Sequence, residues 1–219
     1  MHEAGTDPRA LRREHTVRRL ETFSDIVIAF TLSELALVLR LPQHTRDLLT
    51  HPINLFFFLA SFALVCSLWW LHHRLFARCF YPDTISVLMN FAFLASTVYV
   101  TYSFLLITTF SDVIALSAYA VSIGFAYSLI ALLFAKGLRD PRIKLDEIER
   151  RYNAHLASRV GVAGVGSLVA AMFGILGRGQ GEILAVWIAL AVLLAFIGIR
   201  QRLARRRRER GQGDSSTAS

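Results

Sequence analysis

Apolar residues in this chain gather into six long runs separated by charged segments. The runs cover residues 23–41, 53–71, 85–108, 113–134, 160–176 and 183–199. A transmembrane helix needs about 20 predominantly apolar residues, with about 17 at the short end, and all six runs meet this length. Their apolar side chains cover every helical face instead of alternating at period two, which argues against a β-barrel. The pattern predicts an all-α integral membrane protein with six transmembrane helices.

Six spans leave little of the chain for anything else. Of 219 residues, 54% are hydrophobic and 18% are charged. Six spans of about 20 residues leave roughly 100 residues for ends and loops, too few for a separate soluble domain. The predicted organisation is a basic N-terminal arm (1–22), a six-helix transmembrane domain (23–200), and a tail (201–219) that is first basic and then disordered. Two cysteines, Cys66 in an apolar run and Cys79 beside basic residues, exclude a disulfide scaffold.

Basic residues fall almost entirely on one side of the predicted membrane. Of the 24 Lys and Arg residues, 21 lie in the N-terminal arm, the second and fourth connections and the tail, whereas Arg40, Arg46 and Arg178 lie on the other side. Cytoplasmic segments carry an excess of Lys and Arg. Both termini are therefore predicted to be cytoplasmic, in the plasma membrane of a bacterium.

The charged segments have simple interpretations. The net charge is +8, and Arg205–Arg208 follows the last apolar run closely. A basic run there is typical of a topology anchor or a contact to anionic lipid, and not of nucleic-acid binding. The fourth connection, 136–159, predicts a short polar helix. In the fifth run, Gly166, Ala170 and Gly174 recur at intervals of four, which favours close approach by another helix.

Polar residues concentrate in the first apolar run. Ser24 and Asp25 lie near its start, and Ser33 and Glu34 lie near its middle, with Arg19 just before it. Ionisable groups in hydrocarbon are costly and therefore need a partner or a function. Asp25 can either pin this helix by pairing with Arg19 or a histidine, or take part directly in permeation.

His72 and His73 end the second run. Adjacent helical residues point about 100° apart and chelate one ion poorly, and the sequence offers no third ligand at helical spacing. No metal site is predicted. One of the two imidazoles is instead expected to hydrogen-bond to Ser24 or Asp25, because the start of the first run and the end of the second run lie on the same side of the membrane.

The sequence contains no catalytic motif. It has no glycine-rich phosphate loop, no nucleophile elbow and no paired carboxylates that face one cavity. An enzyme is therefore not predicted, and neither a catalytic residue nor a cofactor is assigned.

Three short motifs resemble those of the lysosomal/endosomal potassium channel family, transmembrane protein 175, and its bacterial members. Residues 19–25 read R-x-x-x-F-S-D, residues 70–73 read W-x-H-H, and an asparagine stands early in the third run. The second motif is one residue shorter between Trp and His than in the family. The residues that carry the resemblance are Arg19, Phe23, Ser24, Asp25, His72, His73 and Asn90.

This resemblance implies a homotetramer of six-helix subunits that conducts K⁺ without a re-entrant selectivity-filter loop. The first helix of each subunit would line the pore. In the family, the signature Arg, Ser and Asp bond to the histidine and the asparagine, which here are His73 (or His72) and Asn90. The family's narrowest ring and the polar layer after it correspond to Phe30 and Ser33.

The first run also carries a candidate pore face. Phe30, Ser33, Glu34 and Leu37 share one side of a helix by the i, i+3, i+4, i+7 rule. Around a fourfold axis, four phenylalanines would form a hydrophobic constriction that closes by dewetting. Four glutamates would draw cations and could not all stay ionised.

Two departures from the family leave alternatives open. Its members are usually aliphatic at the Phe30 position and apolar at the Glu34 position. Glu34 can turn into a helix interface, and Phe30 can be ordinary packing. The leading hypothesis is a potassium-preferring cation channel with K⁺, Na⁺ or H⁺ as the permeant ion. The second is a proton channel or proton-coupled carrier that uses Glu34 and Asp25, and the third is a non-conducting membrane scaffold.

Overall fold

The computed structural model describes residues 8–38, 52–110, 112–177, 179–189 and 192, and within these residues it contains helices and no strand. The five long helices and one shorter apolar helix are α1 (Pro8–Val38), α3 (Pro52–Arg78), α4 (Thr84–Phe110), α5 (Val113–Arg139), α6 (Glu147–Ile175) and Gln180–Ala189. The all-helical fold expected from the apolar runs is confirmed.

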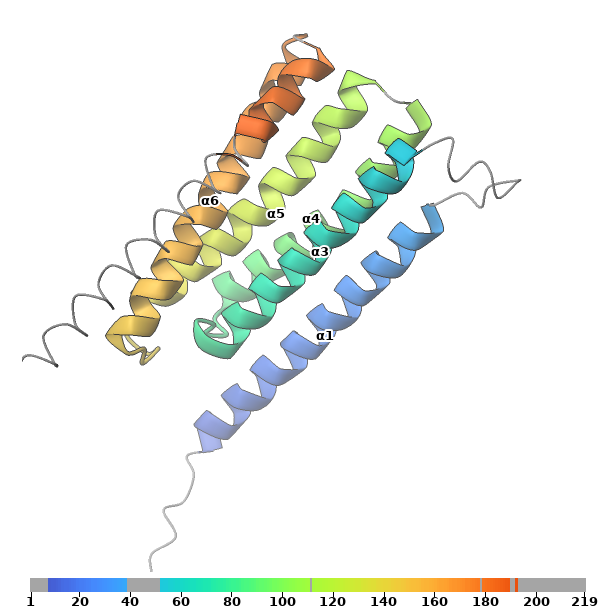
Figure 1. Ribbon diagram of the computed structural model, residues 1–219. Coiled ribbons are helices and arrows are strands. Elements are labelled where there is room, and N and C mark those ends of the chain that lie inside the picture. The colour runs from blue at the N-terminus through green and yellow to red at the C-terminus, as the bar shows by residue number, and fades with distance from the viewer. Residues whose placement is uncertain (1–7, 39–51, 111, 178, 190–191, 193–219) are drawn as a thin grey trace, which may run out of the picture.

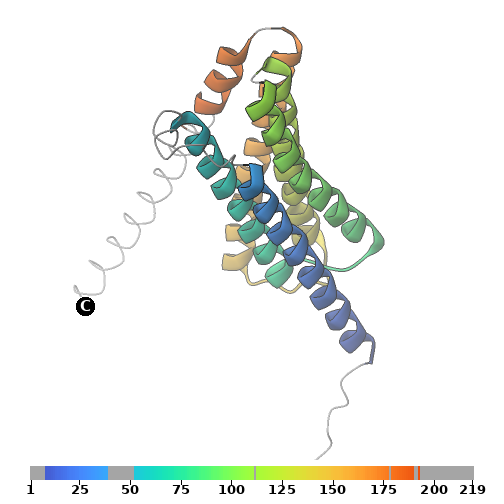
Figure 2. The same ribbon diagram turned by 90° about the vertical axis from the view of Figure 1, so that its right-hand side faces the viewer.

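The helices form an antiparallel bundle with α1 and α6 at opposite edges (Figure 1). Among the five labelled helices, α1 contacts α3 and α4, and α6 contacts α5. The C-terminal ends of α3 and α5 lie beside the N-terminal ends of α4 and α6, and we call this the basic end. The first turns of α1 extend beyond the other helices there (Figure 2).

Length and composition make three of the described helices, α4, α5 and α6, suitable for crossing a membrane. Helix α1 begins at Pro8 and passes through Phe23 without a break, so the expected boundary between residues 22 and 23 falls inside it. The connection 39–51, Arg178 and residues 193–219 lie outside the described residues, and the predictions for the basic tail fall there.

The prediction of a short polar helix over residues 136–159 was wrong. Helix α5 continues to Arg139, a loop follows, and α6 runs uninterrupted from Glu147 into the fifth apolar run. Asp146 caps α6 because its side chain accepts a hydrogen bond from the Glu149 amide at 2.6 Å. No helix breaker stands between the charged and apolar halves, so one helix includes both.

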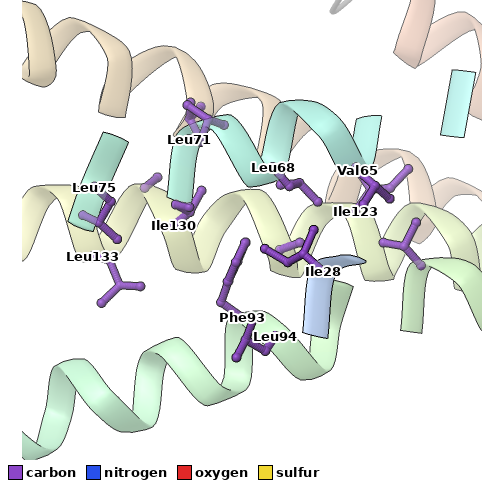
Figure 3. Packing of buried hydrophobic residues seen from close by; sticks show 14 of the residues in the cluster. Ile28, Val65, Leu68, Leu71, Leu75, Phe93, Leu94, Ile123, Ile130 and Leu133 are labelled. Carbon is purple, nitrogen blue, oxygen red and sulfur yellow. The ribbon is translucent and has the colours of Figure 1, made fainter. Parts of the chain in front are cut away.

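The core of the bundle is aliphatic and aromatic. Four helices contribute fully buried side chains to one hydrophobic cluster (Figure 3). Among them are Ile28 from α1, Leu68 from α3, Phe93 from α4 and Ile130 from α5. Hydroxyl groups add hydrogen bonds between helices: Ser61 to Tyr119, Ser67 to Tyr127 and Ser103 to Ser122. These contacts fix α3, α4 and α5 to one another.

Small residues let α5 and α6 approach closely. Ala170 and Gly174 from the predicted stripe are buried, while Gly166 is only half-buried. The closest approach to the α5 backbone is at Gly164, which the stripe omitted: a Cβ there would lie 2.5 Å from the Ser128 Oγ and 2.7 Å from the Ser128 backbone nitrogen. The small-residue stripe of α6 therefore packs against α5.

A cluster of ion pairs lies at the basic end. Lys136 pairs with Asp83, and Arg142 holds Asp140 through Nε–Oδ1 and Nη2–Oδ2 contacts of 2.8 and 2.6 Å. The Arg142 guanidinium also lies 3.5 Å from the centre of the Tyr81 ring. Hydrogen bonding from Arg142 lowers the pKa of Asp140 to about 2, and hydrogen bonding from Lys136 lowers the pKa of Asp83. The cluster ties the α3–α4 loop to the end of α5.

We expect Gly164→Ala to lower the unfolding temperature of the purified protein in detergent, because the new methyl would overlap the α5 backbone. Overpacking of this kind costs about 1–3 kcal/mol. Gly161→Ala is the matched control on the same helix, since its Cβ would lie 3.6 Å from the Ala131 Cβ, an ordinary contact. Equal unfolding temperatures for the two variants would contradict the packing described.

We expect the Asp140–Arg142 pair to stabilise the protein above about pH 4 and to lose this effect as the pH falls toward 2. The sign follows because the folded-state pKa of Asp140 lies below the value of about 3.9 for an unfolded chain. Asp140→Asn should therefore flatten the fall in unfolding temperature between pH 4 and 2. Glu147→Gln, which breaks an exposed arginine pair, should keep the original slope; a common slope for all three proteins would refute the assignment.

Candidate pore helix and its polar anchor

Helix α1 has one face that packs against the bundle. Ser24, Ile28, Thr31 and Leu35 are buried and recur every three or four residues, so they form a single stripe along the helix. Ile28 belongs to the main hydrophobic core, and Thr31 accepts a hydrogen bond at its backbone oxygen from the Thr101 hydroxyl at 3.4 Å. This stripe faces α3 and α4.

The opposite face of α1 carries the predicted pore residues. Phe30, Ser33, Glu34 and Leu37 are all exposed, with 67% of Phe30 and 83% of Leu37 accessible. The Ser33 hydroxyl donates to the Ala29 carbonyl at 3.1 Å, which leaves its lone pairs directed outward. No described part of the chain covers this face, so Glu34 meets no helix interface among the described residues.

Three buried polar side chains join α1, α3 and α4. The Asn90 Nδ2 donates to the Ser24 Oγ at 3.1 Å, and the Asn90 Oδ1 lies 2.9 Å from the His72 Nε2. The Ser24 hydroxyl in turn donates to the Leu20 carbonyl at 2.8 Å. Each of the three side chains has an exposed fraction of 0%. We call Ser24, Asn90 and His72 the polar anchor.

The hydrogen-bond directions in the anchor are mutually determined. Because Asn90 uses its NH₂ group toward Ser24, its oxygen faces His72, and the His72 Nε2 must donate. Phe76 and Phe93 hold the imidazole from either side, with ring centres 4.4 and 5.4 Å away. The Phe76 and Phe93 rings and the Asn90 amide fix the orientation of the His72 imidazole. The hydrogen bond between His72 and Asn90 in turn fixes the Asn90 side chain.

Other signature residues lie outside this anchor. Asp25 accepts a hydrogen bond from the Trp69 indole at 3.0 Å, and Phe23 packs edge-on against Phe91 with ring centres 6.0 Å apart. Arg19 is exposed and makes no hydrogen bond with the described part of the chain. The structure therefore brings together Ser24, His72 and Asn90, but not Arg19.

His73 forms a second polar link from α3 to α1. Its Nδ1 lies 3.2 Å from the Glu21 Oε1, and its ring stacks on Trp69 with centres 5.8 Å apart. Sequence reasoning missed Glu21 and Trp69 as partners. The spacing along each helix could have indicated these pairs. Glu21 and Asp25 on α1 are four residues apart, as are Trp69 and His73 on α3.

Among the described residues, no three His, Cys, Asp or Glu side chains come close enough to hold a metal ion. His72 and His73 point to different partners, in accordance with their angular separation on a helix. The arrangement is suited to positioning α1 by hydrogen bonds and not to metal chemistry.

Residues 19–100 match the family described as endosomal/lysosomal potassium channel TMEM175. This part of the chain therefore resembles the TMEM175 family. The matched segment contains the exposed face of α1 and all three anchor residues, and it supports the resemblance indicated by the R-x-x-x-F-S-D motif. The family is one of ion channels and not of enzymes, and the chain is a multi-pass membrane protein.

Solved structures of channels share the fold. A variant of the potassium channel MtTMEM175, in complex with a nanobody–MBP fusion protein, aligns with a TM-score of 0.65 and 14% identity over 84% of this chain and 93% of that one. A lysosomal potassium-selective channel TMEM175 homologue from Chamaesiphon minutus aligns with a TM-score of 0.63 and 21% identity over 85% and 98%. No curated protein matches the sequence significantly.

We expect Asn90→Ala to destabilise the protein because it leaves the buried His72 Nε2 without its acceptor. An unsatisfied buried donor costs about 1–3 kcal/mol. Ser96→Ala on the same helix is the control, since Ser96 bonds to its own backbone at Ala92 and its loss should cost less than about 0.5 kcal/mol. Thermal unfolding in detergent measures both, and an Asn90→Ala protein as stable as the control would contradict the anchor.

Proposed function

We propose that the protein is a homotetrameric, potassium-preferring cation channel whose pore is lined by α1. One observation carries the proposal: in a chain that resembles a channel family, the face with Phe30, Ser33, Glu34 and Leu37 is left uncovered by the described residues. A symmetric assembly around that face would give it a partner, namely the same face of three other copies.

The carboxylate of Glu34 is the strongest argument for water at this face. An acidic residue near the middle of a membrane helix costs roughly 2.5–3.5 kcal/mol on insertion scales if it faces lipid. Within the described residues, Glu34 has no cationic partner. An aqueous pore removes this cost because water and permeant cations solvate the carboxylate.

The order of residues along α1 suggests how ions would pass. Phe30 would form a ring that dewets when closed, and Ser33 would offer hydroxyl oxygens to an ion just beyond it. Glu34 lies about 6 Å from Phe30 along the helix axis and would concentrate cations at the ring.

The polar anchor would set the rotation of α1. Ser24 lies about 9 Å before Phe30 along the axis, and its bond to Asn90 turns its side of the helix toward the bundle. With Ser24, Ile28 and Thr31 held inward, the opposite side faces outward. Signature residues would therefore act on the pore indirectly, by orienting the helix that lines it.

The proposal also includes an orientation and a domain plan. The basic end would be cytoplasmic in a bacterial plasma membrane, because Lys and Arg accumulate there. Residues 23–200 would form the channel domain, 1–22 a basic arm and 201–219 a basic tail that contacts anionic lipid.

We expect Phe30→Ala to increase K⁺ flux into liposomes at least severalfold, because it widens and hydrates the proposed constriction. Phe125→Ala is the matched control: Phe125 is half-exposed on α5, far from the α1 face, and its loss should leave flux unchanged. Absence of K⁺ flux in the wild type, together with a Phe30→Ala protein that is no leakier, would overturn the channel proposal.

The Glu34→Gln variant separates the potassium channel from its alternatives. We expect it to reduce cation flux through a pore that still conducts K⁺, since the negative charge of the glutamate ring is lost. A proton current that Glu34→Gln abolishes, without K⁺ current in either protein, would instead establish a proton channel. Lack of any flux in all variants would favour a non-conducting scaffold.

A further inference from the structure

A long groove lies on the other side of the bundle from the proposed pore face. It is lined by α3, α5, α6 and the helix Gln180–Ala189, and its volume is about 890 Å³. Among the labelled helices, the backbones of α3 and α6 do not come into close contact, so side chains alone border the space between them. The groove is open toward the surroundings of the bundle, where a membrane would place lipid.

The lining is apolar along most of its length. On α6 the lining positions include Tyr152, Leu156, Val160, Ala163 and Ser167, which recur at intervals of three and four and so form one stripe. At 1.5 Å per residue this stripe is about 22 Å long. A groove of this length and composition suits an extended hydrocarbon chain.

Cationic and aromatic groups gather at the end of the groove that lies toward the basic end. Trp70 and Tyr152 line it there, and Arg159 lines it about 10 Å further along α6. The Arg74 guanidinium lies 4.2 Å from the centre of the Tyr152 ring, and its Nε donates to the Asn153 Oδ1 at 3.1 Å. Trp and Tyr are the residues that prefer the membrane interface. This mouth is suited to a negatively charged headgroup.

Arg159 is exposed but lies further from the basic end than the paired arginines. Arg74 pairs with Asn153 and Arg78 with Glu149, which sets the register of α3 against α6. The same register puts Arg159 level with about Leu68, about 9 Å further in than Arg74. Arg159 has no carboxylate partner within the described residues. An anion from outside the subunit would provide one.

We propose that this groove binds an anionic phospholipid, with an acyl chain along the α3–α6 space and the phosphate between Arg159 and Arg74. The guanidinium groups provide the charge complementarity, and burial of the acyl-chain methylenes adds hydrophobic stabilisation. The site differs from the basic tail, and it does not depend on ion conduction.

Tryptophan fluorescence tests the site directly, because Trp70 and Trp187 line the groove and bromine atoms on lipid chains quench indole emission. The full-length protein in a neutral detergent is titrated with bromine-labelled phosphatidylglycerol or with bromine-labelled phosphatidylcholine. We expect phosphatidylglycerol to quench at a concentration at least tenfold lower. Arg159→Gln should reduce this preference to less than threefold, whereas Arg139→Gln, an exposed arginine outside the groove, should keep it.

A second pair of variants tests the acyl-chain part of the site. Ala163→Phe fills the groove and should weaken quenching by both lipids, whereas the neighbouring Val162→Phe, outside the lining, should not. Circular dichroism and gel filtration confirm folding of each variant. The proposal would be overturned if both lipids quench the wild type equally, or if Arg159→Gln and Arg139→Gln reduce the preference for phosphatidylglycerol equally. The absence of any quenching, as when a second copy or another segment covers the groove, would also overturn it.

Discussion

The orientation of α1 depends on a short chain of hydrogen bonds in a place where water cannot substitute for them. Ser24, Asn90 and His72 come from three different helices, and each is fully buried. If α1 rotated, an amide and an imidazole would lose their partners, at a cost of about 1–3 kcal/mol for each group. The anchor therefore fixes which side of α1 meets the bundle, and hence which side is left for other copies of the chain.

The two halves of the bundle are held together differently. Helices α5 and α6 meet through glycines, with a backbone approach so close at Gly164 that no side chain fits. Helix α1 instead contacts α3 and α4 through one narrow stripe and the anchor. Packing is tightest among α4, α5 and α6, while α1 is held by its buried stripe and the anchor. Such a division suits a helix that must keep one face free for assembly.

Much of this arrangement could be read from the sequence, because it follows from strong and local preferences. Apolar runs predicted the helices, and the R-x-x-x-F-S-D motif indicated the family whose model matches residues 19–100. The spacing of Phe30, Ser33, Glu34 and Leu37 predicted a shared face, and that face is exposed. These features need only helical periodicity and the cost of polar groups in hydrocarbon.

Pairing between helices could not be predicted in the same way. The sequence did not decide between His72 and His73, since one residue of helical rotation determines which imidazole faces Asn90. It also missed the Trp69–Asp25 bond and the continuous α6, because both depend on how segments far apart in the chain meet or continue. The depth of Arg159 became apparent only with the register of α3 against α6.

Cross-linking between subunits tests the central claim most directly, namely that the exposed faces of α1 gather around a common axis. In membranes containing a protein with Cys66→Ala and Cys79→Ala, mild oxidation of an added Leu37→Cys should join subunits through α1 in high yield. Val165→Cys, at a position that is also exposed on α6 (59%, against 83% for Leu37), should stay monomeric under the same conditions. Efficient cross-linking through Val165→Cys with none through Leu37→Cys would contradict a pore formed by α1.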